Sequence, residues 1–477
     1  MAEPDTPLRV STPWGRSETG PDRRHLLGIV LGVLGASAVS WIRAASAGTL
    51  QLPEAPRTWW EQVWPALCLG GCLAVVAFHY LALVRRTRLS LPAILAGGVV
   101  VHLLAGLALP LTSNDLFVNL AYGRLAALGL NPYVTPPAAL PPTDPFVLQG
   151  TRWQHQVTVY GPVFLALVKP IGRFSSAVAA VVVYKASMLA AALLSLLVAY
   201  RVCRERGDPA CAAGALAMFA LAPVFAWELS GQAHIDAVVV LLMVGFVWAA
   251  ISDREWLAAA CLATALFTKL SVAPVLALYL VAIARRRALR AAAMTVAVVA
   301  AGLLLFLPFW EGPASLLGFA QAIGGAGMGT ARSFSSLALW LVRPLGPTVQ
   351  TVTARACWVA GMGVVAAVGV RALVAVRTPA DVIEQSLLVL GAYCLVGTPW
   401  FHPWYVTWLL PLALVHRDAR WRALTALYAA IVTVQYILPL DPLTSVAVDL
   451  IVLMRAWTLM RGGGRATGGW APAPRPS

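Results

Sequence analysis

The sequence predicts an all-α polytopic membrane protein, and three observations support this fold class. Of 477 residues, 60% are hydrophobic and 12% are charged, whereas an ordinary soluble domain carries about 25% charged residues. The mean hydropathy is +0.77. Apolar runs long enough to cross a bilayer recur from His25 to Met460, and in lipid such runs form helices because a helix pairs its own backbone polar groups.

The basic residues set the expected orientation of these runs. The net charge is +15. Short clusters of arginine and lysine separate the runs, at residues 23–24, 85–88, 201–206, 285–287, 371–377 and 417–422. Such clusters are typical of cytoplasmic loops. A nucleic-acid surface, the alternative explanation of the charge, needs a groove-forming domain that the sequence lacks. We therefore expect no nucleic-acid partner and a multi-pass protein of the plasma membrane with both termini in the cytoplasm.

Taken in order, the runs give about 14 transmembrane segments. The first six are expected at residues 25–42, 63–84, 89–111, 176–200, 210–227 and 235–251. Block 256–284 has cytoplasmic-type charge at both ends, which predicts a hairpin of two broken helices meeting near Lys269. The last six are expected at residues 289–309, 352–374, 383–398, 405–415, 424–440 and 445–460.

This order of runs defines the expected domain organisation. Residues 1–24 form a polar, Pro-rich and disordered cytoplasmic tail, residues 25–461 a single membrane-embedded domain, and residues 462–477 a second cytoplasmic tail. Two long loops, 112–174 and 310–350, then lie on the outer side.

The motif Ser113-Asn114-Asp115-Leu116-Phe117 follows the third run. A lone carboxylate at the exit of a membrane span must face water, a partner charge or a substrate. If Asp115 begins a helix, Asn119 and Tyr122 share its face at i+4 and i+7, and Gly129 ends the helix. The alternative is that Asp115 only caps this helix.

Further polar and aromatic side chains fall on the same side of the membrane. They are Asn114, His155, Tyr160, Gln232, His234, Asp236, His402, Trp404 and Tyr405. Together they predict one outward-facing pocket that binds substrate. Each residue alone has an ordinary alternative, either a satisfied core position or an interfacial aromatic belt.

Positive charge outside the cytoplasmic clusters is scarce, so each case is informative. Arg124 and Arg332 fall in the outer loops, and Lys185 and Lys269 lie in or between spans. A bound phosphate would explain some of these positions. The seven cysteines include no CxxC pair, and we interpret them as small core residues. No clear metal-ligand cluster is present, so no cofactor is expected, with a divalent metal left open.

Several motifs in order resemble one enzyme family. They are the motif at 113–117, Tyr122-Gly123-Arg124, Asn131-Pro132-Tyr133, Tyr160-Gly161-Pro162, Gly231-Gln232-Ala233-His234-Ile235-Asp236 and Pro403-Trp404-Tyr405. Between about Leu89 and Val415 the chain looks like the actinobacterial polyprenyl-phosphate-mannose-dependent mannosyltransferases of the GT-C superfamily. The resemblance implies a GT-C-like bundle with interfacial helices in its outer loops, and Asp115 as the general base.

The resemblance also implies the substrates, a polyprenyl-phosphate-linked mannose and a glycan or glycolipid acceptor at the outer face of the bilayer. A carboxylate can take the acceptor's proton as the new C–O bond forms, in one inverting displacement. The alternative from another class is a lipid-linked sugar flippase or secondary transporter. Broken helices near Lys269 would suit it, but no internal repeat is seen and the polar residues gather in outer loops.

Overall fold

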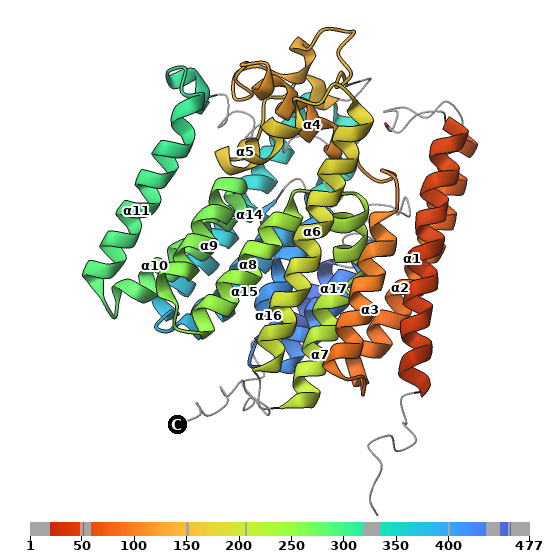
Figure 1. Ribbon diagram of the computed structural model, residues 1–477. Helices are drawn as coiled ribbons and strands as arrows, with labels where there is room; N and C mark the ends of the chain where they lie inside the picture. Colours follow the sequence, from red (N-terminus) through yellow and green to blue (C-terminus); the bar gives the residue numbers. More distant parts are fainter. Residues whose placement is uncertain are drawn as a thin grey trace, which may run out of the picture.

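The computed structural model describes residues 20–47, 51, 59–148, 152–205, 208–317, 334–398, 401–435, 449–456 and 458. Throughout these residues the secondary structure is helical and no strand occurs. Long helices run side by side, and α4 and α5 lie above one end of them with the loops that join them (Figure 1). The expected all-α class is therefore confirmed.

The helical segments that frame the fold and the site occur in the following order along the described residues. They are α1 (Gly20–Ala47), α2 (Trp59–Arg86), α3 (Leu91–Gly106), α4 (Asp115–Ala127), α5 (Pro162–Ile171), α6 (Ala177–Arg204), α7 (Pro209–Ala220), η3 (Phe225–Gly231), α8 (Asp236–Ile251), α9 (Glu255–Thr268), η4 (Leu270–Val272), α10 (Ala273–Ala284), α11 (Ala288–Phe306), α13 (Phe334–Val342), α14 (Pro347–Ala375), α15 (Pro379–Ala392), η7 (Tyr393–Gly397), η8 (Pro403–Trp408), α16 (Leu409–Leu414) and α17 (Ala419–Gln435).

Six of these helical segments are long and apolar enough to cross a membrane, which confirms a polytopic membrane protein. They are Gly20–Ala47, Val63–Arg86, Ala177–Arg204, Ala288–Phe309, Pro347–Ala375 and Pro379–Gly397. The pair α7 and η3 makes a seventh if its 45° bend belongs to one broken span. Five further apolar helices are shorter, α3, α5, α8, α9 and the segment Leu270–Ala284. The total of about 14 spans stays a prediction, and these counts apply to the described residues.

The hairpin expected around Lys269 is present. Helix α9 ends at Thr268 and α10 begins at Ala273. Glu255, at the start of α9, pairs with Arg287 at 3.3 Å and with Arg290 at 2.5 Å, beyond the end of α10. The two ends of the hairpin therefore lie together, and the break lies at the opposite end of the bundle. At that end the N–H of Gly161 donates to the carbonyl of Thr268 at 3.1 Å.

The third run differs from its expected length. The run 89–111 was expected to be one span, but α3 ends at Gly106. Pro110 explains the early stop, because proline restricts the preceding residue to extended backbone and cannot donate a helical hydrogen bond. Side chains satisfy the released backbone instead, and Ser40 Oγ accepts from the N–H of Leu109 at 2.9 Å. The chain then runs without helix to Asp115.

Helix α4 has the boundaries that the sequence predicts. It begins at Asp115 and ends before Gly129, whose φ of +81° favours glycine. The N–H of Leu130 donates to the carbonyl of Leu125 at 2.9 Å, which is the hydrogen bond of a Schellman cap. Helix α4 packs closely on the segment after α5, because a Cβ at Gly172 would lie 2.3 Å from the backbone of Gly123. These contacts fix the helix that carries Asp115.

Candidate active site

Asp115 is held at the first turn of α4 but is not the cap of the helix. The cap is Asn114, which makes no side-chain capping bond. Ser113 Oγ accepts from the N–H of Asp115 at 3.0 Å and donates to its Oδ1 at 2.9 Å. The other carboxylate oxygen, Oδ2, points to a different partner. Capping therefore does not account for this carboxylate.

That partner is His234, which lies between two carboxylates. Its Nδ1 is 3.5 Å from Asp115 Oδ2, and its Nε2 is 3.2 Å from Glu228 Oε2. The side chains of His234 and Glu228 are each 1% exposed, whereas that of Asp115 is 20% exposed. Of the three, Asp115 is the group that solvent or a substrate can reach. The turn that carries His234 contains Ala233 at a φ of +59°, between η3 and α8.

The charges in this cluster shift the pKa values of both Asp115 and His234. Burial alone would raise the pKa of Asp115, but the adjacent His234, together with His402 and the Ser113 hydroxyl, lowers that pKa to about 2. Burial would lower the pKa of His234, but Asp115 and Glu228 raise it to about 9. At neutral pH the pair is therefore a carboxylate beside an imidazolium.

An aromatic stack supports the histidine from its face. The ring of His234 lies 3.7 Å from that of Trp404, and Trp404 lies 4.1 Å from the ring of His402. Both rings stack nearly parallel on the indole, which fixes the plane of the imidazole. The segment η8, two turns of tight helix, supplies Trp404 and Tyr405. The structure thus brings the motif Pro403-Trp404-Tyr405 to the cluster that contains Asp115.

Asp236 and Lys269 form a second charged pair next to this cluster. Lys269 Nζ is 2.9 Å from both carboxylate oxygens of Asp236, and Trp408 Nε1 donates to Asp236 Oδ1 at 2.6 Å. The ammonium also lies over the rings of Tyr405, at 4.9 Å, and Tyr160, at 5.7 Å. The broken hairpin positions Lys269 here, and the carboxylate of Asp236 neutralises its charge.

Three other predicted residues hold the local backbone and helices. Gln232 Oε1 accepts from the N–H groups of Leu111, at 2.7 Å, and Thr112, at 3.0 Å. Gln232 therefore anchors the chain that leads to Asp115. On α4, Asn119 donates to the hydroxyl of Tyr184 at 2.8 Å. Tyr122, further along α4, donates its hydroxyl to the carbonyl of Gln156 at 3.0 Å.

Other predicted residues do not join the cluster. Arg124 Nε pairs with Asp144 at 2.8 Å, and its NH1 donates to the carbonyl of Gly172 at 3.1 Å. Its guanidinium thus holds together the loop that carries Asp144 and the end of α5, and the geometry gives no support to a phosphate role. His155 is exposed beside Gln154, at 2.9 Å. Arg332 lies outside the described residues.

Glu228 is the site residue that sequence reasoning missed. It lies in an apolar stretch. The argument used for Asp115 applies to it equally, because a carboxylate among membrane-spanning residues is costly unless a charge or a substrate meets it. No group of three or more His, Cys, Asp and Glu side chains within the described ranges is arranged to hold a metal ion.

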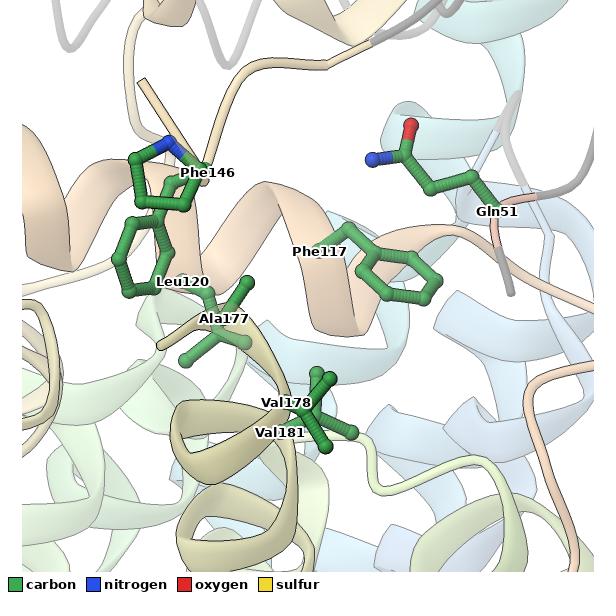
Figure 2. A pocket seen from close by; sticks show the side chains of 8 residues that line it. Gln51, Phe117, Leu120, Phe146, Ala177, Val178 and Val181 are labelled. Atoms are coloured by element: carbon green, nitrogen blue, oxygen red, sulfur yellow. The ribbon is translucent and has the colours of Figure 1, made fainter. Parts of the chain in front are cut away.

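An apolar groove lies beside α4. Phe117 and Leu120 of α4 face Ala177, Val178 and Val181 of α6 across it (Figure 2). Gln51, Pro145 and Phe146 complete its lining. Its volume is about 170 Å³.

The fold and the site define the class of the protein, a polytopic membrane protein with an ionised acid–base cluster at one end of its helical bundle. Residues 24–287 match the model of the MptA_B family, described as alpha-(1->6)-mannopyranosyltransferase, N-terminal domain, and the chain belongs to this family. The expected resemblance to mannosyltransferases is thereby confirmed, and the protein is a glycosyltransferase of the mannosyltransferase type. No curated protein and no solved structure matches the chain.

Proposed function

We propose that this mannosyltransferase takes mannose from a polyprenyl-phosphate donor at the outer face of the plasma membrane and transfers it to a hydroxyl of a glycan or glycolipid, with Asp115 as the general base. The observation that carries the proposal is the position of Asp115. Its carboxylate is the exposed member of a buried charged cluster, on a helix at one end of the membrane bundle. Family membership favours this transferase over the flippase or transporter alternative.

The proposed reaction is a single displacement. The acceptor oxygen attacks the anomeric carbon of mannose while Asp115 takes the proton of the acceptor hydroxyl. The bond between the anomeric carbon and the phosphate oxygen breaks, and its electron pair leaves with the polyprenyl phosphate. One displacement inverts the anomeric carbon, so an α-linked product corresponds to a β-linked donor. Glu228 is too deeply buried to act as a second carboxylate on the sugar.

His234 has a positioning role in this scheme. Its imidazolium keeps Asp115 ionised and directs Oδ2, and it also makes the carboxylate a weak base. A weak base suffices here, because the acceptor oxygen gains positive charge as the C–O bond forms and its proton becomes acidic. Trp404 stacks on the face of the imidazole, and the Glu228 carboxylate lies 3.2 Å from its far nitrogen.

The donor class is tested by offering two donors to the purified protein in lipid vesicles. One reaction contains mannosyl-phosphoryl-polyprenol alone, and the other contains GDP-mannose alone, with the same glycolipid acceptor. We expect mannosylated product from the lipid donor only. Product from the nucleotide sugar, with none from the lipid donor, would overturn the proposal.

A further inference from the structure

Lys185 is a cation inside the membrane helix α6 that is not matched by a carboxylate. Its ammonium donates to the carbonyl of Gly231, and across the described residues no acidic side chain forms an ion pair with it. An ammonium at this depth is costly unless an anion meets it. Lys185 therefore differs from Lys269 and Arg124, whose charges are balanced by carboxylates.

Two other cations that the sequence singled out are already paired with carboxylates. Lys269 is paired with Asp236 at 2.9 Å, and Arg124 is paired with Asp144 at 2.8 Å. Of these three cations, Lys185 is the one whose charge an anionic ligand can balance. Lys185 is therefore the candidate partner for the phosphate that the sequence predicts.

Lys185 lies one helical turn along α6 from the lining of the apolar groove. Val178 and Val181 line the groove, and Lys185 follows them on the same face of α6 at i+7 and i+4. Side chains of a helix lean toward its N-terminus, so the ammonium reaches back toward the groove. Val178 is 63% exposed and Val182 is 61% exposed, so this side of α6 faces the bilayer. A lipid can therefore enter from the side.

We propose that Lys185 and the groove between α4 and α6 bind the polyprenyl-phosphate part of the donor, with the ammonium on the phosphate and the groove around the first isoprene units. This inference rests on the proposed function and adds its donor-binding residues. Gly231, which Lys185 contacts, lies three residues before His234. The phosphate and the base Asp115 would then lie on the two sides of one turn, with the sugar between them.

A purely structural role for Lys185 makes a different prediction. As a cap, Lys185 would only satisfy the free carbonyl at the end of η3. A glutamine can donate such a bond without charge, and an arginine can donate it with charge. The set Lys185→Arg, Lys185→Gln and Lys185→Met therefore separates the phosphate role, which needs the charge, from the capping role, which needs a donor.

The first experiment measures the KM for mannosyl-phosphoryl-polyprenol and the inhibition constant of sugar-free polyprenyl phosphate. We expect both constants to rise about 10-fold or more in the Gln and Met variants, because each loses one charge-assisted hydrogen bond to the phosphate. In the Arg variant, which keeps the charge, both constants should stay within a few-fold of the wild-type values. If the Gln variant keeps wild-type constants, the inference is wrong. If wild-type protein does not use the lipid donor at all, the proposed function itself fails.

The second experiment tests the groove with Val178→Trp, which fills it. We expect a higher KM for the lipid donor than in wild-type protein, because the indole would occupy the space of the first isoprene units. Leu194→Trp is the matched control, because Leu194 is 50% exposed on α6 and does not line the groove. Equal constants for Val178→Trp and Leu194→Trp would contradict the groove assignment.

Discussion

The Nδ1 atom of His234 lies 3.5 Å from Oδ2 of Asp115, across the junction between helix α4 and the turn that joins η3 to α8. This contact joins the motif at residues 113–117 to the motif that contains His234. It gives Asp115 an ionised carboxylate with a defined orientation, and it gives the proposed base a partner whose own titration is measurable.

The first prediction concerns pH. Since the pKa of His234 in the folded protein is raised to about 9 from 6.5, the stability from its ion pairs is complete below pH 6.5 and is lost as the pH rises through about 9. We expect the thermal midpoint and activity to fall across that range. In His234→Gln this alkaline loss should be absent, and its persistence would contradict the assignment.

The same variant tests the acidic limb. The pKa of Asp115 is lowered from 3.8 to about 2, so the stability from its ionisation is present above pH 3.8 and is lost as the pH falls through about 2. Without the imidazolium, burial should raise this pKa. The acidic limb of the kcat/KM profile should then move to higher pH in His234→Gln.

The second prediction concerns Glu228. Glu228→Gln keeps the size of the side chain but removes one of the two carboxylates that raise the pKa of His234. The alkaline limb of activity should therefore move to lower pH. Glu384→Gln is the control, since Glu384 pairs with Arg417 at 3.3 Å and not with the cluster. Identical profiles for Glu228→Gln and wild-type protein would remove Glu228 from the site.

The third prediction concerns the pair of Asp236 and Lys269. Lys269→Met leaves the buried Asp236 carboxylate without its cation, and loss of one partner of a buried pair costs about 3–5 kcal/mol. The thermal midpoint in detergent should drop clearly. The double variant Asp236→Asn with Lys269→Met should recover part of the loss. A double variant that is less stable than the single one would show that the two side chains are not coupled.

The fourth prediction concerns topology. The loop that contains Pro137 is expected outside the cell, and the cluster that contains Arg286 inside it. A cysteine placed at Pro137 should react with an impermeant thiol reagent in intact cells, above the background of the natural cysteines. One placed at Arg286 should react only after the cells are opened. The reverse pattern would place the site on the cytoplasmic side.

Local sequence patterns were sufficient to predict several features of the fold. The apolar runs predicted the class, the charge at both ends of block 256–284 predicted the break at Lys269, and Gly129 predicted the end of α4. Each of these features depends on residues that are close in the sequence and on whether they face lipid or water. The predicted end of the third run was several residues too late. Helix α3 stops earlier because of Pro110, and the side chains of Ser40 and Gln232 bind the backbone that follows it.

The pairing of charges could not be read from the sequence. Arg124 looked available for phosphate until the fold placed Asp144 beside it. Glu228 looked like one residue of an apolar run, and the turn at Ala233, between η3 and α8, brings His234 back to it. The first pair depends on how the loops pack, and the second depends on a turn conformation that residue types alone do not specify.

The central claim is that Asp115 is the base, and Asp115→Asn tests it most directly. Asparagine keeps the size of the side chain and its ability to bond Ser113, but it cannot accept the proton. Asp208→Asn is the matched control, since Asp208 caps α7 away from the cluster.

The measurement is the turnover of lipid-linked mannose by purified Asp115→Asn, with its thermal midpoint recorded alongside. We predict a fall in kcat of about 100-fold or more, with the midpoint showing a folded protein and with Asp208→Asn close to wild type. Near-normal turnover by folded Asp115→Asn would contradict the account.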